Sequence, residues 1–387
     1  MEWVFVTGGT GFIGACVLER LVRHHKVGVF LLIRAPNKRS AIEKLWRALE
    51  AHLDEEGFEE VLSRVVFVQG DLSEPRLGMS PKAREEIIER VNSILHIGAT
   101  LNRRSERSCL NTNLKGTLSV ILLAREIVEQ GKKLRRFSEV STVAVAGERK
   151  GEIVHEDKAI DWNRRDYDPY ARTKKFGEHM VEELLQDLSY LIFRPSIVMG
   201  DSRKAKTTQF DMVKAFSILA DLPILPLDGR TRLDIVPVDF VARAIADLHL
   251  RDKVDHHVYH LSAGVASKTA EEIADAMLDA FPERRRPIFV PWLSSPFEAS
   301  MRALANLPKS SLSRVGALFS VFWPYIVFDT VFDNQRVVQA LGEVPVPFTA
   351  YCAELYRWAK KVNFRYPHTD LPSRFEGLAK GEGIRWV

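Results

Sequence analysis

An apolar run that ends in a glycine-rich turn constrains this chain more than any other stretch: Val4-Phe5-Val6-Thr7-Gly8-Gly9-Thr10-Gly11-Phe12-Ile13-Gly14. An amphipathic segment follows as far as His24. A strand that enters such a turn and opens a helix predicts a dinucleotide-binding unit, because free N–H groups at the helix start bind phosphate oxygens. Gly8 permits the tight turn, Gly11 lets a pyrophosphate approach the backbone, and Gly14 lets helix and strand pack closely. A glycine turn without a ligand is the alternative, which the spacing and the strand context disfavour.

Apolar runs of strand length alternate with helical periodicity beyond this turn. Strands are expected at 27–33, 65–68, 94–97, 137–140, 191–193 and 258–261, and helices at 41–53, 114–129, 170–185 and 238–250. This alternation implies right-handed crossovers and a parallel sheet with helices on both faces. The predicted fold class is therefore α/β, a Rossmann-type doubly wound parallel sheet.

A less regular region begins beyond Pro195, where strand signals become sparse and prolines frequent. The α/β rhythm returns with a strand-like segment at 233–236. We therefore assign residues 1–200 and 230–262 to a cofactor-binding domain. Residues 201–229 and 263–387 are assigned to a smaller, mostly helical substrate-binding region.

An apolar segment at 315–328 stands out in that region, because its only polar side chains are Ser320 and the hydroxyl of Tyr325. It is too short to span a membrane, and Pro324 is expected to interrupt a helix. Buried core is the favoured interpretation. The alternatives are a wall of an acyl-chain tunnel or a peripheral membrane contact, with Lys309 and Arg314 near anionic headgroups.

Composition is typical of a soluble globular protein, with 46% hydrophobic and 27% charged residues. The three cysteines, Cys16, Cys109 and Cys352, are far apart, and the histidines lack metal-ligand spacing. Neither a disulfide framework nor a metal site is therefore expected. No signal peptide precedes the strand at Trp3, so we expect a cytoplasmic protein.

Basic residues gather at 103–107, 132–136 and 284–286, although the net charge is only +4. Such clusters are usually solvated faces. The alternative is that one of them guides a phosphate-bearing or acidic carrier of the substrate. Nothing in the sequence is typical of a nucleic-acid-binding module, so no nucleic-acid partner is expected.

Arg34 follows the second expected strand, twenty positions after Gly14. An acidic residue here would bind the ribose 2′-OH of NAD, whereas an arginine suits a 2′-phosphate. Lys38 and Arg39 add positive charge close behind. The sequence therefore predicts NADPH, with an ordinary surface arginine as the alternative.

Tyr170 and Lys174 stand four positions apart at the start of an expected helix, behind a strand that ends in Ser141-Thr142. Residues at this spacing share one helical face, so the ammonium can lie near the phenol. A fixed cation favours the phenolate and makes the phenol a usable proton donor or acceptor. The pattern alone is common, and its place before the sixth strand strengthens the prediction of a catalytic pair.

These features together resemble the extended short-chain dehydrogenase/reductases over about residues 1–262. The matching features are the glycine turn, Asp71, His96-Ile97-Gly98-Ala99-Thr100, Asn113, Ser141-Thr142, Tyr170 with Lys174, and Arg194-Pro195. Within that superfamily the chain is most similar to thioester and fatty acyl-CoA reductases. This similarity rests on a long insertion between the second and third strands, on Gly70-Asp71-Leu72 with 73–78, and on Val140-Ser141-Thr142. Phe328-Asp329 and Asp333-Asn334 match loosely, and Leu101-Asn102-Arg103-Arg104 departs from the family, where an aromatic residue is frequent.

The resemblance implies four catalytic residues. Thr142, five positions before Gly147, would orient the substrate carbonyl, and Tyr170 would protonate the developing oxyanion. Lys174 would hold the nicotinamide ribose and tune Tyr170, while Asn113 would help a proton relay. The implied cofactor contacts are Gly8, Thr10, Gly11, Phe12, Ile13, Gly14, Arg34, Asp71, Leu72, Gly98, Ala99, Thr100, Tyr170, Lys174, Pro195, Ser196, Ile197 and Val198.

The implied reaction is hydride transfer from NADPH to an acyl thioester of CoA or of an acyl or peptidyl carrier protein. The product would be an aldehyde and, after a second hydride, an alcohol. A ketone or hydroxysteroid-type reductase of the same fold is the nearest alternative. A nucleotide-sugar epimerase is disfavoured because Arg34 does not suit a retained NAD. An NADPH sensor without chemistry is disfavoured by the intact Tyr170 and Lys174.

Overall fold

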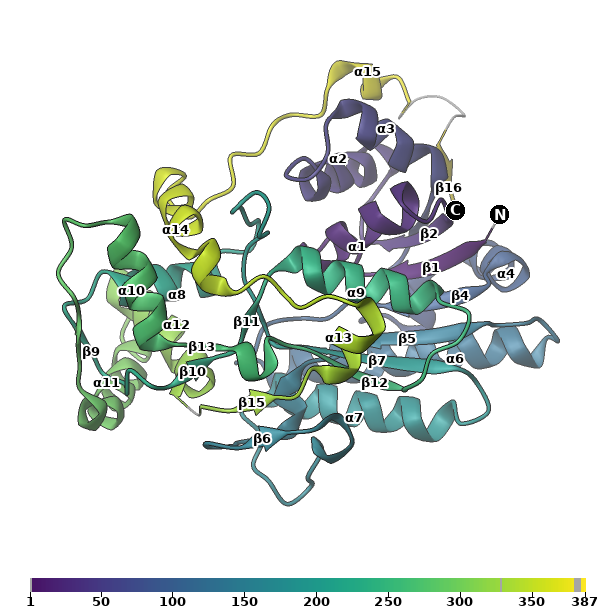
Figure 1. The fold of residues 1–387 in the computed structure, drawn as a ribbon. Helices are drawn as coiled ribbons and strands as arrows, with labels where there is room; N and C mark the ends of the chain where they lie inside the picture. The colour runs from purple at the N-terminus through teal and green to yellow at the C-terminus, as the bar shows by residue number, and fades with distance from the viewer. Residues whose placement is uncertain (1, 328, 379–383) are drawn as a thin grey trace.

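One parallel sheet organises the chain, for which the computed structural model describes residues 2–327, 329–378 and 384–387. Its eight strands lie in the order β12-β7-β5-β4-β1-β2-β3-β16, and every neighbouring pair is parallel (Figure 1). The strands are β1 Trp3–Thr7, β2 Gly28–Ile33, β3 Val65–Gln69, β4 Ser93–His96, β5 Arg136–Val140, β7 Tyr190–Pro195, β12 Val258–Leu261 and β16 Arg385–Trp386. The predicted Rossmann-type fold is confirmed. Strand order reverses at β1, which lies between β2 and β4, and ligands bind at such a switch point.

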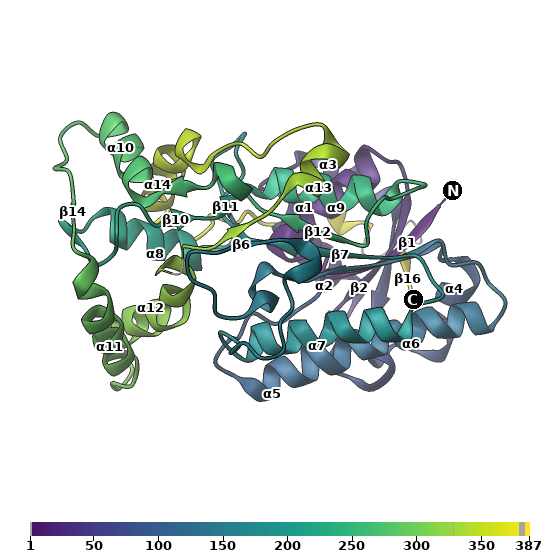
Figure 2. The same cartoon turned by 60° about the horizontal axis from the view of Figure 1, so that its bottom comes forward.

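Helices cover both faces of the sheet, which explains why its strands are apolar throughout (Figure 2). One face carries α1 Phe12–Arg23, α2 Lys38–Leu49, α3 Glu55–Arg64 and α9 Val238–Leu250, and the other α4 Pro81–Arg90, α6 Gly116–Glu129 and α7 Pro169–Leu184. Successive side chains of a strand point to opposite faces. Val4 and Val6 therefore join one hydrophobic core and Phe5 the other.

The helix expected at 41–53 is found as α2, but it begins at Lys38 and ends at Leu49, and a second helix, α3, begins at Glu55. Asn37 caps α2 by accepting the Ser40 N–H at 2.9 Å. Asp54 caps α3 in the same way by accepting the Gly57 N–H, also at 2.9 Å. Each side chain satisfies an N–H group that has no partner within its helix, so each starts a helix of its own.

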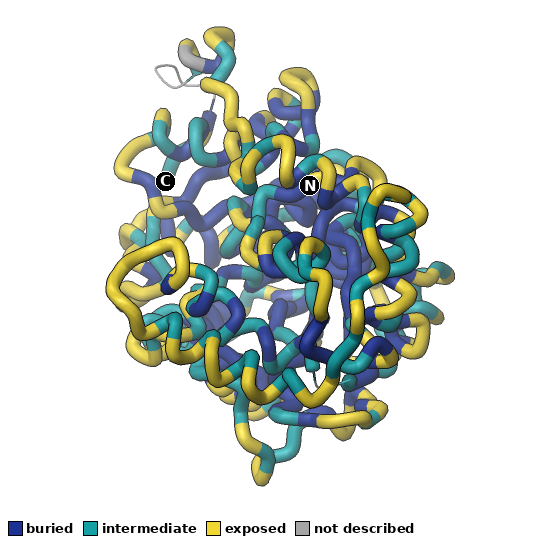
Figure 3. The backbone as a smooth tube through the Cα atoms, turned by 90° about the vertical axis from the view of Figure 1, so that its left-hand side faces the viewer, coloured by how far each residue is buried: buried dark blue, intermediate teal, exposed yellow. Residues whose placement is uncertain are grey.

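A mostly helical region, here called the helical cap, lies beside the carboxyl ends of the strands (Figure 1). It consists of α8 Asp211–Ala220, α10 Ala270–Ala280, α11 Ser294–Ala305, α12 Ser311–Val327 and α14 Cys352–Lys361. Figure 3 looks onto this side, where exposed loops surround buried segments. The strand expected at 233–236 is divided between the two regions. β11 Ile235–Val236 pairs with β8 Ile197–Val198, whereas β10 Arg232–Leu233 pairs with β13 Lys268–Thr269.

Helix α12 contains the apolar segment expected at 315–328, of which Phe328 lies outside the described residues. Phe319 and Trp323 are buried in the core of the cap, which confirms the core interpretation. The expected interruption at Pro324 is wrong, because α12 continues through it. Proline removes one hydrogen bond there, but it stands in the last turn of the helix, next to the buried Trp323. In the part of the chain that the structure describes, no helix has the length and hydropathy to cross a bilayer.

The end of the chain returns to the sheet. β16 pairs with β3, opposing Arg385 to Val66 and Trp386 to Phe67, and α13 Gln335–Leu341 packs against α9 and β12. Both pieces fall within 263–387, which the sequence assigns to the substrate-binding region. A two-residue strand carries no periodicity, so no sequence pattern could locate it.

Candidate active site

The turn after β1 packs against the backbone that follows β4. Gly8 has a φ of +75°, and a Cβ there would lie 2.5 Å from the Gly98 nitrogen. Gly14 approaches the Gly8 carbonyl oxygen too closely for any side chain. At Gly11, by contrast, a Cβ would meet only the Gly8 oxygen, at 3.4 Å. Gly11 therefore leaves open space at the start of α1, where N–H groups can bind an anion.

A cleft of about 560 Å³ lies at the carboxyl ends of β1 to β5. The predicted residues that line it are Gly8, Thr10, Gly11, Phe12, Ile13, Gly14, Arg34, Asp71, Leu72, Gly98, Ala99, Thr100, Tyr170 and Lys174. The predicted residues that do not line it are Asn113, Thr142, Pro195, Ser196, Ile197 and Val198. The structure thus brings the glycine turn and the Tyr170–Lys174 pair to one cleft.

Two cations stand at one end of the cleft. The Arg34 side chain is 76% exposed, and its Nη1 lies 3.3 Å from the Asp71 carboxylate. Lys44, which sequence reasoning missed, also lines the cleft and donates to the Arg34 carbonyl at 3.3 Å. Burial and the Arg34 charge lower the pKa of Lys44. Burial opposes ionisation of Asp71, but hydrogen bonds from Ser73 and the Arg34 charge outweigh it and lower the pKa of Asp71.

Tyr170 and Lys174 occupy the first turns of α7, which begins where Asp168 accepts the Ala171 N–H at 2.8 Å. The Lys174 side chain is only 1% exposed. Its Nζ donates to the Val140 carbonyl at 2.8 Å and approaches the Glu139 carboxylate at 3.2 Å. These contacts fix the ammonium at the end of β5, beside the cleft.

Arg103 lies against Tyr170, although the sequence places it in a cluster interpreted as a solvated face. Its guanidinium carbon is 4.4 Å from the centre of the Tyr170 ring, and its side chain is 16% exposed. Nη1 donates to Asp168 at 3.0 Å and to the Tyr325 hydroxyl at 2.5 Å. That hydroxyl donates to Asp168 at 2.8 Å. This Arg103 cluster, formed by Arg103, Asp168 and Tyr325, therefore joins the start of α7 to α12 of the cap.

The hydroxyls of Ser141 and Thr142 lie in different environments. Ser141 lines the cleft and is buried, and its Oγ has no hydrogen-bond partner among the described residues. Thr142 Oγ1 accepts the Ala144 N–H at 3.2 Å. Thr142, the predicted catalytic hydroxyl, does not line the cleft, whereas its neighbour Ser141 does.

Asn113 is buried and bonded to the loop after β4. Its Oδ1 accepts the Thr100 N–H at 2.8 Å, and its Nδ2 donates to the Thr100 carbonyl at 3.2 Å. Nδ2 also lies 3.4 Å from Thr173 Oγ1 on α7. The carboxamide thus shapes the wall of the cleft, and the predicted proton relay stays a prediction.

A small pocket of about 40 Å³ lies between the segment after β5 and the cap. Ser196 and Ile197 line it, together with Val143 and Ala144, which directly follow Thr142. Asp234 and Tyr325 complete its polar lining, beside Tyr167, Arg232 and Thr330. Burial raises the pKa of Asp234 to about 7. In the sequence, Thr142 therefore stands between Ser141, which lines the cleft, and Val143 and Ala144, which line this pocket.

Residues 6–245 match the family model described as male sterility protein. The chain belongs to the male sterility protein family. This family member is 30% identical over 276 residues to the fatty acyl-CoA reductase wat of Drosophila melanogaster, covering 62% of this chain and 53% of that protein. It is also 30% identical over 287 residues to the nonribosomal peptide synthetase asaC of Aspergillus flavus, covering 70% of this chain and 27% of that protein.

A solved structure shares the fold of this male sterility family protein. It is the terminal R domain from the myxalamid PKS-NRPS biosynthetic pathway, with a TM-score of 0.79 and 24% identity, covering 95% of this chain and 92% of that one. The chain spans 26% to 53% of the length of four curated relatives that it matches. Activity, substrate and partners are therefore a matter of proposal.

Sequence reasoning missed several residues that line or border the cleft of this male sterility family protein. Gln209 lines it from the segment before α8, and no motif marks it. Asp168 carries a usable signal, because Asp before Pro169 is typical of a helix start. No sequence signal marks Tyr325, because its partner Arg103 lies 222 positions away in the chain.

Proposed function

We propose that this chain reduces an acyl thioester with NADPH. The observation that carries the proposal is that Tyr170 and Lys174 line the same cleft as the glycine turn, with the Arg34 guanidinium at its other end. A fatty acyl-CoA reductase and a nonribosomal peptide synthetase among the relatives support a thioester on CoA or on a carrier protein. The helical cap, which closes the small pocket beside Thr142, would face the substrate.

The residues of the cleft fit a phosphorylated nicotinamide dinucleotide. Gly11 leaves the helix start open to a pyrophosphate, and Arg34 with Lys44 offers two cations to a 2′-phosphate. Asp71 and Leu72 would contact the adenine, and 195–198 would lie beside the nicotinamide. When bound, the cofactor supplies a hydride to the carbonyl carbon of the substrate.

The chain's own residues would stabilise charge and move protons. Thr142 would donate a hydrogen bond to the thioester oxygen, and Tyr170 would give that oxygen its proton as negative charge develops. Lys174, held by the Val140 carbonyl, would stabilise the phenolate left on Tyr170. The hydroxyl would then return its proton to the Tyr170 phenolate as the C–S bond breaks, the departing sulfur would take one proton, and an aldehyde would remain. One thioester, one hydride and one proton thus give one aldehyde and one thiol.

The test is to incubate the protein with NADPH and a panel of acyl-CoAs, acyl carrier proteins and ketones. NADPH oxidation is followed by absorbance, and free thiol by a disulfide reagent. We expect one thiol per NADPH for an aldehyde product, or one per two NADPH if the alcohol forms. Oxidation of NADPH on ketones without thiol release would replace this proposal by a ketone reductase. No oxidation with any substrate would contradict both.

A further inference from the structure

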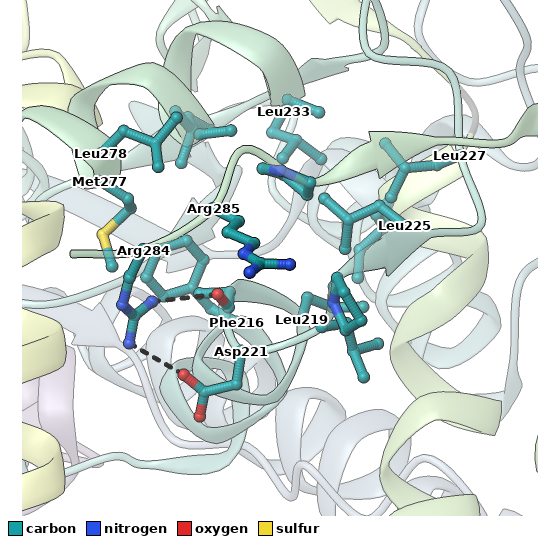
Figure 4. Close-up of a pocket in the computed structure, with 18 residues that line it drawn as sticks. Phe216, Leu219, Asp221, Leu225, Leu227, Leu233, Met277, Leu278, Arg284 and Arg285 are labelled. Carbon is teal, nitrogen blue, oxygen red and sulfur yellow. Dashed lines mark hydrogen bonds and ion pairs between the residues drawn. The ribbon is translucent and has the colours of Figure 1, made fainter. Parts of the chain in front are cut away.

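A second cavity, of about 370 Å³, lies inside the helical cap (Figure 4). Its walls come from α8, β9 Ile224–Leu225, α10 and α12. The lining is almost wholly apolar and includes Leu219, Leu225, Leu233, Met277 and Ile326. The volume falls in the lower part of the usual range for small-molecule sites, about 300–1,000 Å³.

The cap cavity and the small pocket near Thr142 are lined by residues that are adjacent in the chain. Leu233 and Ile326 line the cavity, whereas their chain neighbours Asp234 and Tyr325 line the small pocket beside Thr142. The wall between the two spaces is therefore formed by β10 and the last turn of α12. The opposite end of the cavity reaches the surface, because Asp221, Pro223 and Arg285 line it and are exposed. A ligand would enter from this surface.

Three consecutive arginines at this mouth have different partners. Arg284 binds Asp221 at 3.0 Å, and Arg286 binds Glu271 and Asp275, each at 2.9 Å. Arg285 alone of the three has no hydrogen-bond or ion-pair partner among the described residues, and Figure 4 shows its side chain extending over the space between Leu219 and Leu225. An unpaired guanidinium thus stands over an apolar cavity.

The charges around Arg285 favour a ligand with a single negative charge. Asp221 is the carboxylate in the lining, and Arg284, Lys360 and the Tyr356 hydroxyl bind it. Arg285 is therefore the cation left to meet an anion. A guanidinium matches the two oxygens of a carboxylate, and one guanidinium balances one negative charge.

We propose that the cap cavity binds a medium-chain fatty acid, with the alkyl chain among the leucines and the carboxylate on Arg285. This site is separate from the cleft that holds Tyr170, and it does not depend on the proposed reductase activity. A failure of fatty-acid binding in the cap cavity can therefore be distinguished from a failure of reductase turnover in the Tyr170 cleft.

Calorimetric titration of the full chain with hexanoate, octanoate and decanoate tests the proposal. Each methylene buried should tighten binding about fourfold, so each step of two carbons should tighten it about 15-fold until the cavity is full. Octanol, which lacks the charge, should bind about tenfold more weakly than octanoate. No decanoate binding at millimolar concentration, or equal affinity for octanol and octanoate, would overturn the proposal.

Two variants locate the site. Arg285→Gln should weaken octanoate binding about tenfold. Ala274→Phe places a larger side chain in the cavity, so the longest fatty acid that still binds should have fewer carbons. Arg286→Gln is the matched control, because Arg286 is paired outside the cavity, and it should leave affinity unchanged. Thermal unfolding checks that each variant folds. Binding that neither Arg285→Gln nor Ala274→Phe alters would place the ligand elsewhere and contradict the proposal.

Discussion

The sheet and the helical cap each enclose a cavity, and the two are built in different ways. The cofactor cleft takes much of its lining from turns that directly follow β1, β2, β3, β4 and β5, and Tyr170 and Lys174 of α7 complete it. The cap cavity takes its lining from one face each of α8 and α10 and from single residues of β9 and α12, and apart from the arginines at its mouth no motif marks them. A parallel sheet brings the ends of its strands to one edge whatever their sequence separation. Helices have no such rule, so only their tertiary packing decides which side chains meet.

Two of the places where the two regions join are the Arg103 cluster, beside Tyr170, and Asp234. The Arg103 cluster links the start of α7 to α12, and Asp234 stands between β11, which pairs with β8, and β10, which pairs within the cap. If the sheet binds the cofactor and the contacts between the regions tune the chemistry, substitutions in the two places should differ in effect. Those in the sheet should alter cofactor affinity, and those between the regions should alter turnover.

Tyr170→Phe should have the largest effect. It removes the proton donor and leaves the ring against Arg103, so turnover should fall about 100-fold or more. NADPH affinity, measured by fluorescence titration, should stay within about twofold, because the glycine turn and Arg34 are unchanged. Turnover at the level of the parent protein would remove Tyr170 from the mechanism.

Thr142→Ala compared with Ser141→Ala tests which hydroxyl meets the substrate. Loss of one oxyanion donor lowers turnover about 100-fold, and we expect this for Thr142→Ala. Ser141 lines the proposed cofactor cleft, so Ser141→Ala should alter mainly the KM for NADPH. Steady-state kinetics with both substrates separates these results. The opposite pattern would transfer the catalytic role to Ser141.

Asp234 should make stability depend on pH where the two regions meet. Its carboxyl keeps a proton up to about pH 7 in the folded protein, and an unfolded chain releases it near pH 4. The folded state therefore binds more protons between these values, so the free energy of unfolding falls as pH rises through this window. Asp234→Asn, which stays neutral, should remove a decline on the order of 4 kcal/mol across this window.

Urea unfolding at pH 5, 6, 7 and 8 measures this difference between parent and variant. His52 contributes with the opposite sign, because burial lowers its pKa to about 4 and its stabilisation is lost as pH falls. His52 is present in both proteins, so the difference isolates Asp234. Parallel pH profiles would show that Asp234 is ionised in the folded state.

Arg34→Ala should weaken NADPH binding about tenfold and leave NADH within about twofold, since only NADPH carries the 2′-phosphate. Arg47→Ala is the control, because Arg47 is exposed on α2 and does not line the cleft. Fluorescence titration with both cofactors gives the ratio. Equal weakening of NADPH and NADH would refute the 2′-phosphate assignment.

The sequence predicts the sheet and the glycine turn well because both depend on local patterns. The run from Val4 to Gly14 contains its own strand, turn and helix start, and the structure has all three there. Pro324 and Arg103 were interpreted wrongly for one reason. Proline usually ends a helix and arginine usually lies in solvent. Here contacts with segments distant in the sequence outweigh both preferences.

Arg103→Met should have a smaller effect, a fall in turnover of about fivefold. The substitution keeps the apolar stem and removes the cation over the Tyr170 ring, and such contacts contribute about 1 kcal/mol. If Arg103 acts through Tyr170, the same change in a Tyr170→Phe background should cost nothing further, because the group it acts on is already gone. If it only holds α12 in place, turnover should fall in both backgrounds and the thermal unfolding temperature should drop with it. The double-mutant cycle thus decides whether this contact between sheet and cap serves catalysis or only the fold.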